Sequence, residues 1–246
     1  MQRKVIITAD GSSTIQIEDW NEQYHSVHGA IQEANHVYIE HGFLFYVESN
    51  LKFNAPSFEI NEDTSQTKRQ ASATNNPGIN ILEIGFGTGL NALLTYLKSQ
   101  ELNLNITYTG VEAFPISSDE LALLNYNEEL QIINSVFQKM HEVPWQEKYQ
   151  ISEHYILEKQ QRTFETISDE NKYNVIYYDA FGPRVQPELW TEGILAKMFK
   201  ALKPKGVLTT YSAKGSVKRA LESVGFEVGR LQGPPGKRHM LRGVKS

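Results

Sequence analysis

The sequence predicts an α/β fold with a mainly parallel sheet and helices on both of its faces. From residue 79 onward, apolar runs of strand length alternate with amphipathic runs of helix length, which is the pattern of consecutive βαβ units. A glycine-rich turn joins the first of these strands to the first helix, and two strand-like runs in succession close the chain. The closing pair predicts an antiparallel hairpin at one edge of the sheet.

The elements of this core follow from hydrophobic periodicity, because strands alternate every two residues and helices every 3.6. The expected strands are residues 79–84, 106–111, 150–157, 173–178 and 206–211, with closing strands near 226–231 and 239–244. The expected helices are residues 90–98, 117–137, 187–202 and 216–224.

An N-terminal extension precedes the core. Strand-like residues 5–8 and 14–17 flank an Asp10-Gly11 turn and predict a hairpin. Residues 29–41 have helical spacing and Gly42 as a stop, and the apolar run 43–47 fits either a strand or more helix. We therefore expect three parts: an extension at 1–58 that packs on the core, a flexible polar loop at 59–78, and the core at 79–246.

Composition excludes several classes of protein. The chain has 246 residues, 40% of them apolar, and no cysteine, so disulfides, zinc–thiolate sites and thiol catalysis are ruled out. No apolar run approaches the ~18 residues of a membrane span, and the N-terminus has too short an apolar stretch for a signal peptide. We expect a cytoplasmic protein. The spacing of the seven histidines matches no metal-binding motif, so no metal site is expected.

The net charge of −5 conceals a strong asymmetry. Residues 203–246 hold ten Lys or Arg and two acidic residues, a local charge of +8, whereas residues 1–202 carry −13. Uneven charge of this kind is more informative about partners than the total. The basic C-terminal part is compatible with a nucleic-acid partner, although a solvated basic face is an equally ordinary interpretation.

The glycine-rich turn runs from Ile81 to Asn91 and contains Gly85, Gly87 and Gly89. Alternate glycines let the backbone turn tightly and approach a ligand closely, and ligands of open α/β sheets bind at the carboxyl ends of the strands. The dinucleotide fingerprint requires Gly or Ala where Leu90 stands, which disfavours a dehydrogenase.

The second core strand ends in Glu112, twenty-nine residues after Glu83. A carboxylate there can accept two hydroxyl hydrogen bonds from a ribose diol. A structural turn and an exposed acid remain the alternative for either feature taken singly, but together they favour a nucleoside-type cofactor.

A third informative segment follows the fourth core strand. The strand 173–178 delivers Asp179 to its carboxyl end, and Ala180-Phe181-Gly182-Pro183 follows. Pro187-Glu188-Leu189-Trp190 then opens a helix in which Trp190 is expected to pack in the core.

The turn Glu83-x-Gly85-x-Gly87-x-Gly89 resembles motif I of class I S-adenosylmethionine-dependent methyltransferases, which have a Rossmann-like sheet. The ordered set of 85–91, 179–183, 187–190 and 236–241, with 24–33 before it, resembles the methyltransferase part of the bacterial tRNA 5-methylaminomethyl-2-thiouridine biosynthesis protein. Because the chain ends before an FAD-dependent oxidase domain, it is similar to a stand-alone methyltransferase form. Ala180 and Gly182 stand where the family more often has Gly and Ala.

This resemblance implies S-adenosyl-L-methionine as cofactor and the 5-aminomethyl group of wobble 5-aminomethyl-2-thiouridine in tRNA as substrate. The implied cofactor residues are Glu83, Gly85, Phe86, Gly87, Thr88, Gly89, Asn91, Glu112, Glu158 and Asp179. Glu158 stands where the family often has Gly-Asp. A monomer acting after a separate tRNA-modifying oxidase is expected.

The implied substrate residues divide into catalytic and binding groups. Asp179 is the candidate proton acceptor or orienting group for the amine, with a loop-structuring acid as the alternative. Phe181 is expected to stack on the wobble base and Tyr24 to line the pocket, although core or surface packing fits each nearly as well. The expected tRNA contacts are Tyr24, Pro183, Lys214, Lys218, Arg219, Lys237 and Arg238.

Two other activities remain open at this point. A small-molecule amine N-methyltransferase would share the cofactor site but bind its substrate without dependence on salt. A non-catalytic S-adenosylmethionine-binding module would bind the cofactor without turnover.

Overall fold

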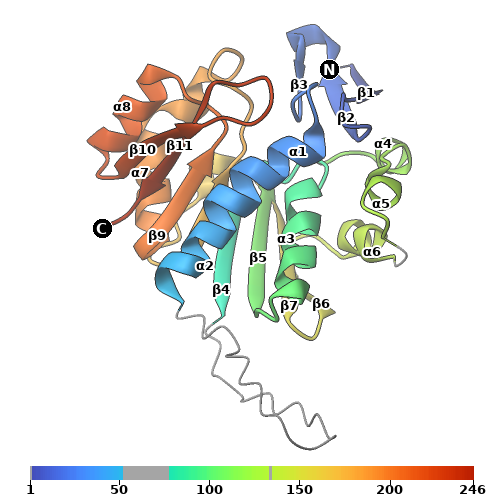
Figure 1. Ribbon diagram of the computed structural model, residues 1–246, viewed down its shortest axis with the longest axis horizontal. Coiled ribbons are helices and arrows are strands. Elements are labelled where there is room, and N and C mark those ends of the chain that lie inside the picture. Colours follow the sequence, from blue (N-terminus) through green and yellow to red (C-terminus); the bar gives the residue numbers. More distant parts are fainter. Residues whose placement is uncertain (1, 52–77, 133–134) are drawn as a thin grey trace, which may run out of the picture.

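An eight-stranded sheet with helices on both faces forms the body of the molecule (Figure 1). The computed structural model describes residues 2–51, 78–132 and 135–246. The predicted polar loop 59–78 lies outside these residues except for Gly78. The strands lie in the spatial order β10 (Glu227–Gln232), β11 (His239–Val244), β9 (Leu202–Thr210), β8 (Tyr173–Tyr178), β4 (Ile79–Ile84), β5 (Ile106–Glu112), β7 (Tyr155–Gln161) and β6 (Lys148–Ser152).

The centre of the sheet is parallel and its edges are antiparallel. Strands β9, β8, β4, β5 and β7 pair in parallel, while β11 pairs antiparallel with β9, β10 with β11, and β6 with β7. The predicted α/β class and the predicted closing hairpin are therefore confirmed. All five parallel strands end at the same edge of the sheet, which is where a ligand site is expected.

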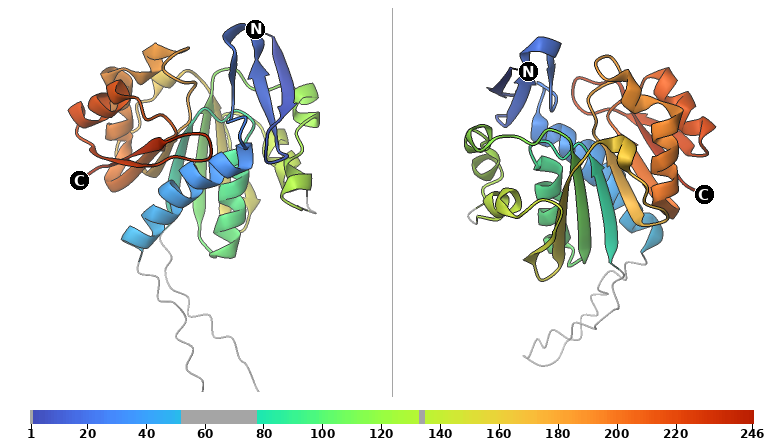
Figure 2. Two further views of the ribbon diagram at one scale, coloured as in Figure 1. Left: turned by 45° about the horizontal axis from the view of Figure 1, so that its top comes forward. Right: turned by 180° about the vertical axis from the view of Figure 1, so that it is seen from behind.

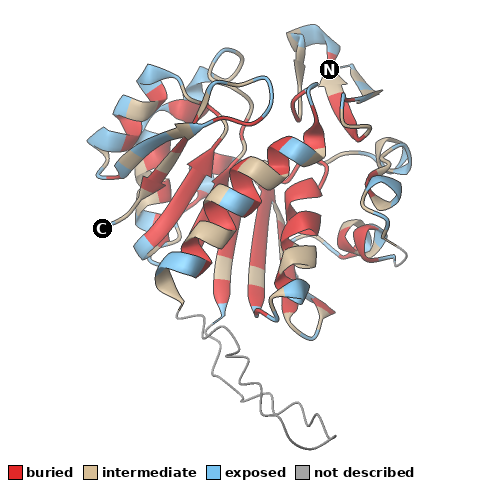
Figure 3. Ribbon diagram, viewed as in Figure 1, coloured by how far each residue is buried: buried red, intermediate tan, exposed pale blue. Residues whose placement is uncertain are grey.

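Both faces of the sheet are buried, as Figure 3 shows for its central strands. In β8, Val175 and Tyr177 pack into one core while Tyr173, Ile176 and Tyr178 pack into the other. Side chains of successive strand residues point to opposite faces, so a strand covered on both sides is apolar at nearly every position. This explains the continuous apolar run that predicted β8.

Helices cover the two faces in separate layers (Figures 1 and 2). One layer contains α1 (Ala30–Ala34), η2 (Asn35–Leu44), α2 (Phe45–Asn50) and α3 (Leu90–Glu101). The other contains α7 (Glu192–Ala201) and α8 (Gly215–Ser223). Three short 3₁₀ turns, η1 (Glu18–Trp20), η3 (Phe164–Thr166) and η4 (Pro187–Trp190), lie in the loops.

The segments α1, η2 and α2 run into one another as one long helix, of which η2 is a π-helix. The run 43–47, which sequence left open, is thus helical. Gly42 does not stop the helix, contrary to expectation. A Cβ at Gly42 would lie 3.0 Å from Thr209 Oγ1 and 3.2 Å from the Tyr177 ring, so the glycine allows the helix to pack closely on the sheet.

Several predicted elements differ from the structure in their extent. The helix expected at 187–202 is the 3₁₀ turn η4 followed by α7, and the strand expected at 206–211 begins already at Leu202. The helix expected at 117–137 is divided into α4 (Ser118–Ala122), α5 (Tyr126–Glu129) and α6 (Val136–Glu142). Asn125 interrupts it, because its side-chain oxygen accepts the Ser13 N–H at 2.7 Å and its amide donates to the Gly11 carbonyl at 2.9 Å. The strand expected at 150–157 is two strands, β6 and β7, joined through residues 153–154.

The predicted N-terminal hairpin is confirmed as β1 (Arg3–Ile7) and β2 (Ser13–Ile17), to which β3 (Glu22–Gln23) adds a third strand. This small sheet lies beyond the carboxyl ends of the parallel strands (Figure 1). Arg3 fastens it to the core by donating to the Phe114 carbonyl at 2.9 Å, and Arg184 pairs with Glu22 at 2.9 Å. Across the described residues, no helix is long and apolar enough to cross a membrane.

Candidate active site

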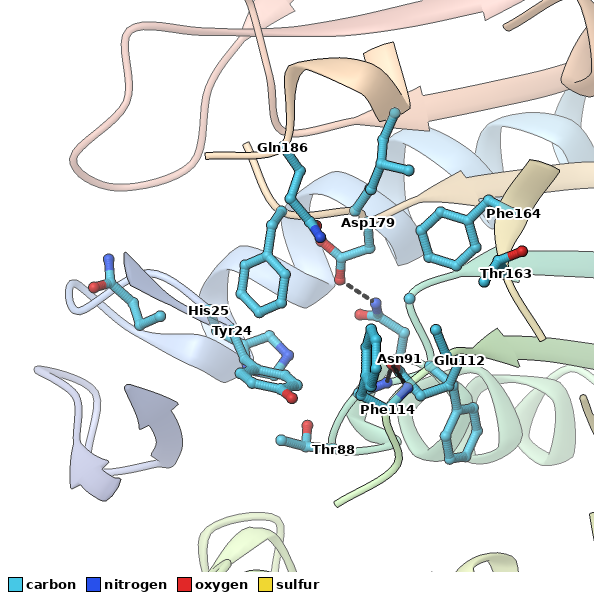
Figure 4. A pocket seen from close by; sticks show the side chains of 18 of the residues that line it. Tyr24, His25, Thr88, Asn91, Glu112, Phe114, Thr163, Phe164, Asp179 and Gln186 are labelled. Carbon is cyan, nitrogen blue, oxygen red and sulfur yellow. Dashed lines mark hydrogen bonds between the residues drawn. The ribbon is translucent and has the colours of Figure 1, made fainter. Parts of the chain in front are cut away.

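A pocket opens where the parallel strands end and the N-terminal sheet faces them (Figure 4). It is lined by Arg3, Trp20, Gln23, Tyr24, His25, Gly85, Phe86, Gly87, Thr88, Leu90, Asn91, Glu112, Ala113, Phe114, Thr163, Phe164, Glu165, Asp179, Ala180, Phe181, Gln186, Glu188, Leu189 and Tyr211. The lining therefore joins the ends of β4, β5, β7 and β8 to the N-terminal extension. It includes nine of the eighteen residues that the sequence nominated.

The glycine turn forms one wall, and its backbone excludes other residues. Gly85 has φ +90°, and a Cβ there would lie 2.6 Å from the Asp179 carbonyl oxygen. Gly87 has φ +51°, and a Cβ would lie 2.9 Å from the Tyr24 ring. Left-handed φ and close approach both require glycine. Gly89, also at positive φ, begins α3 behind the wall and is outside the lining.

Glu112 stands at the end of β5 and holds the glycine turn. Its Oε2 accepts the Gly87 N–H at 3.0 Å, and its Oε1 accepts the Phe114 N–H at 2.9 Å. Both oxygens keep acceptor capacity, since each carboxylate oxygen has two lone pairs. A carboxylate fixed in this way at the pocket wall suits the two hydroxyls of a ribose.

Asp179 and Asn91 form the floor of the pocket (Figure 4). Asp179 Oδ1 accepts the Tyr38 hydroxyl at 2.6 Å, and its Oδ2 accepts the Asn91 amide at 2.9 Å. Burial raises the pKa of Asp179 to about 7, although these two donors act to lower it. A carboxyl group at this pKa can take up and release a proton near neutral pH.

Glu83, which is expected to bind the cofactor, lies behind the floor and is outside the lining. It is 1% exposed and accepts the Asn91 amide at 2.8 Å and the Tyr108 hydroxyl at 2.9 Å. Burial, and then the charge of Asp179, raises the pKa of Glu83 well above its ordinary value. Its observed contacts position Asn91.

The Asn91 amide donates to both Glu83 and Asp179, so both of its hydrogens are used. Its Oδ1 is buried and has no hydrogen-bond partner among the described residues. A buried acceptor without a donor costs about 1–3 kcal/mol. Because Asn91 lines the pocket, a bound ligand with an N–H group could satisfy it.

An aromatic cluster forms the outer rim. The Phe181 ring meets the Trp20 ring edge-to-face at 5.5 Å and the Tyr24 ring at 5.1 Å. The buried Trp190 donates to the Phe181 carbonyl at 2.8 Å, and Tyr211 donates to the Ala180 carbonyl at 2.9 Å. Trp190 is thus in the core as expected, and it fixes the loop that presents Phe181. Flat aromatic faces of this kind can stack on a nucleobase.

The structure does not bring Glu158 into the pocket. The strand β7 continues to Gln161, so Glu158 lies in its interior, where Oε1 accepts from the Gln160 side chain at 2.5 Å. Thr163, Phe164 and Glu165, just beyond the end of β7, line the pocket instead. The predicted strand ended at residue 157, whereas β7 runs to Gln161, and Glu158 therefore lies inside the sheet and not at its edge.

The residues expected to contact tRNA also lie outside the pocket lining, apart from Tyr24. Pro183 lies in the loop between β8 and η4. Lys214, Arg219 and Arg238 are exposed. Lys218 pairs with Glu222, and Lys237 pairs with Glu33 while its Nζ lies 4.1 Å from the centre of the Tyr211 ring. Lys237 therefore joins the C-terminal loop to α1 rather than presenting an unpaired charge.

Several lining residues were not nominated from sequence. Trp20 and Arg3 come from the extension and had no motif to mark them. Tyr38, which is not itself part of the lining, lies beneath Asp179 on η2, and its helical spacing predicted only a place in a helix. Phe164 could have been found as the first large apolar residue after β7.

Known proteins share the fold of this chain and part of its sequence. A family model described as S-adenosyl-L-methionine-dependent methyltransferase matches residues 131–246. The crystal structure of MnmC2 from Aquifex aeolicus matches the fold with a TM-score of 0.73 at 24% identity, over 98% of this chain and 69% of that one. Residues 131–246 are thus similar to S-adenosyl-L-methionine-dependent methyltransferases, which indicates S-adenosyl-L-methionine as the cofactor, and the sheet has the Rossmann-like fold of the matched structure.

Relatives narrow this class. The tRNA 5-methylaminomethyl-2-thiouridine biosynthesis bifunctional protein MnmC of Actinobacillus pleuropneumoniae serotype 5b is 28% identical over 208 residues. That match covers 77% of this chain and 31% of the relative. MnmC of Leptospira borgpetersenii is 30% identical over 175 residues, covering 68% of this chain and 27% of the relative. The chain is related to the methyltransferase domain of MnmC and spans about a third of the length of these relatives.

Proposed function

We propose that this protein methylates the exocyclic amine of 5-aminomethyl-2-thiouridine at the wobble position of tRNA, giving 5-methylaminomethyl-2-thiouridine. One observation carries the proposal. Asp179, a buried carboxyl with a pKa of about 7, lies under the aromatic rim in the same pocket as the glycine turn and Glu112. The relation to MnmC, whose name specifies this modification, supports the choice of amine.

The residues present fit the cofactor. The glycine turn brings the backbone itself to the pocket wall, because Asp179 and Tyr24 leave no room for a side chain at Gly85 or Gly87. Glu112 suits a ribose, and the buried Asn91 Oδ1 is an acceptor without a donor among the described residues. Phe114 and Phe164 line the part of the pocket beyond Glu112, where apolar rings suit a purine. When bound, S-adenosyl-L-methionine supplies an activated methyl group, so the protein chiefly needs to position the amine.

In this proposal, Asp179 removes a proton from the substrate amine. A primary alkylamine has a pKa near 10.4, so on the order of 10⁻³ of it is neutral at pH 7. The ionised Asp179 attracts the ammonium group and accepts its proton, directly or through water, leaving the nitrogen lone pair free to attack. Tyr38 and Asn91 hold the two carboxylate oxygens while this happens.

The rim supplies the second requirement, which is to hold a base outside its stack. Phe181, Tyr24 and Trp20 present aromatic faces and edges around the pocket mouth. Single-stranded RNA bases are commonly held by stacking on such rings. The wobble uridine, splayed from the anticodon, would place its 5-aminomethyl group toward Asp179.

The test is transfer of tritium from labelled S-adenosyl-L-methionine into tRNA that bears the aminomethyl group. We expect transfer by the native chain and a loss of 10²–10⁴-fold in Asp179→Ala, the range of general acid–base catalysis, with cofactor binding retained by calorimetry. Transfer only to a free small amine would replace the proposal with a small-molecule methyltransferase. Cofactor binding without transfer to any such tRNA would indicate a binding module.

A further inference from the structure

Two histidines and a glutamate gather on the solvent side of η2, outside the residues that line the active-site pocket. Ligand atoms of His36, Glu40 and His41, one from each, all lie within 4.8 Å of one another. His36 Nδ1 is 3.5 Å from Glu40 Oε2, and the two imidazole rings meet edge-to-face at 4.7 Å. The two rings are half-buried and the carboxylate is exposed.

The π-helical backbone is what brings these side chains together. In an α-helix, residues five apart point about 140° away from each other, because each residue turns the helix by about 100°. In a π-helix, hydrogen bonds join residues i and i+5, so these residues lie one turn apart on the same side. His36 and His41 are five apart, and Glu40 flanks them. Sequence spacing hid the cluster because spacing is normally judged on an α-helical period.

His36 is oriented as metal-binding histidines usually are. Its Nε2 lies 2.9 Å from the Gln232 backbone carbonyl at the end of β10. A carbonyl oxygen only accepts, so Nε2 carries a hydrogen, and Nδ1 is the ring nitrogen that faces Glu40. A hydrogen bond from the second ring nitrogen to a carbonyl or carboxylate fixes the tautomer and ring angle of most metal-bound histidines.

The electrostatic surroundings limit which cation could bind. Arg242 packs over the Phe45 ring at 3.4 Å and reaches the His41 carbonyl at 3.5 Å. The positive charge of Arg242 repels a nearby cation. Only an ion that bonds strongly to the imidazole nitrogens would therefore be held at this position.

We propose that His36, Glu40 and His41 form a site for a divalent transition-metal ion, with zinc the best match. Two imidazole nitrogens and one carboxylate oxygen leave one tetrahedral position for water. Zinc bonds of 2.0–2.2 Å place tetrahedral ligand atoms about 3.4 Å apart, so the three ligand atoms, which lie within 4.8 Å of one another, must move closer by rotation of their side chains. Bridging residues i, i+4 and i+5 would stabilise the π-helical turn against an α-helical one.

Calorimetric titration of the full chain with zinc chloride tests the site. We expect one equivalent to bind, and each of His36→Ala, Glu40→Gln and His41→Ala to weaken binding by roughly tenfold or more, because even outer-shell changes cost about 10–100-fold. His154→Ala is the matched control, since His154 is a partly exposed histidine beside Glu153, and this variant should bind zinc as the native chain does.

Thermal unfolding supplies a second measurement that does not involve activity. Zinc should raise the melting temperature of the native chain and of His154→Ala, but not of a variant lacking all three ligands, because only the folded π-helix holds them together. The three side chains are at least partly exposed, so replacing them should leave the fold intact. Circular dichroism checks that each variant folds. Equal zinc affinity in the native chain and the triple variant would overturn the proposal, as would an equal loss in His154→Ala.

Discussion

Asp179 is a buried carboxyl whose pKa lies near neutral pH. Its carboxyl is closed off from water by the N-terminal extension, which raises the pKa to about 7, while Tyr38 and Asn91 each hold one oxygen. An ordinary aspartate would be fully ionised and a weak base at neutral pH. A carboxyl that titrates near the working pH matches the requirement of a proton acceptor.

The first prediction concerns the pH dependence of methyl transfer. Only ionised Asp179 accepts a proton, so kcat/KM should rise with pH through about 7. Tyr38→Phe removes a donor that lowers the pKa of Asp179, and this limb should therefore move to higher pH. Tyr46→Phe, which loses only a contact with Asn174, is the control. A limb that stays in place in Tyr38→Phe would contradict the role assigned to Asp179.

The second prediction concerns stability in the absence of ligands. The pKa of Asp179 is higher in the folded chain, about 7, than its ordinary 3.8, so the folded state binds the proton more tightly. The stabilisation from this proton is complete below about pH 4 and is lost as the pH rises through 7. Urea unfolding of Asp179→Asn between pH 4.5 and 8 should show a shallower decline in the free energy of unfolding than the native chain. Parallel declines would refute this linkage.

At the scale of elements, the glycine turn packs through Phe86 against Gly110, a glycine inside the neighbouring strand β5. The Phe86 side chain extends from the turn and packs against Gly110 of β5, where a Cβ would be 2.3 Å from the ring. The ring also lies 6.2 Å from Trp145 and 5.9 Å from His141, between the sheet and α6. The position of the cofactor turn thus depends on the packing of one aromatic side chain.

The third prediction tests that dependence. Gly110→Ala should push Phe86 away and cost about 1–3 kcal/mol of stability, the range for overpacked cores, and should weaken cofactor binding. Gly193→Ala in α7 is the matched control, because the nearest atom to a Cβ added at Gly193 would lie 4.0 Å away. Alanine at this position should raise the free energy of unfolding by about 0.5–1 kcal/mol. Denaturant titrations measure both changes. Equal effects at the two glycines would show that the Phe86 contact is unimportant.

Sequence reasoning succeeded where local pattern and final structure share a cause. The strand β8 was found because both of its faces are buried, and the glycine turn because its φ angles and close contacts exclude other residues. It failed where tertiary contacts decided. Asn125 breaks a helix by binding the hairpin backbone, and Gly42 sits inside a helix because Thr209 and Tyr177 approach it. No local pattern in the sequence encodes those partners.

The site was predictable to a similar degree. Asp179, Glu112 and the glycines follow strands, so their meeting at one sheet edge is a property of the fold. Trp20 and Tyr38 come from a separate extension whose docking onto the sheet could not be read from periodicity. Glu158 was misplaced because β7 runs four residues further than expected, and a shift of that size moves a residue from the edge into the sheet.

At the scale of the whole molecule, the N-terminal extension completes a pocket that the sheet leaves half open. Arg3, Trp20 and Tyr24 all line the pocket from the extension, and Glu33 on α1 pairs with Lys237 from the loop between β10 and β11. This ion pair joins the N-terminal extension to the C-terminal part of the chain. The same C-terminal part, residues 203–246, carries the local charge of +8.

The last prediction follows from that charge and separates a tRNA substrate from a small amine. Each phosphate contact that a cation makes releases counterions, so binding of tRNA should fall steeply with salt. Replacing exposed Lys214, Arg219 and Arg238 singly by Gln should each reduce the slope of log affinity against log salt by about 0.7–0.9. Lys148→Gln, on the opposite edge strand β6, should leave the slope unchanged. Fluorescence anisotropy with labelled tRNA measures these slopes; affinity independent of salt, or an equal effect of Lys148→Gln, would remove the basic C-terminal part from the tRNA-binding surface.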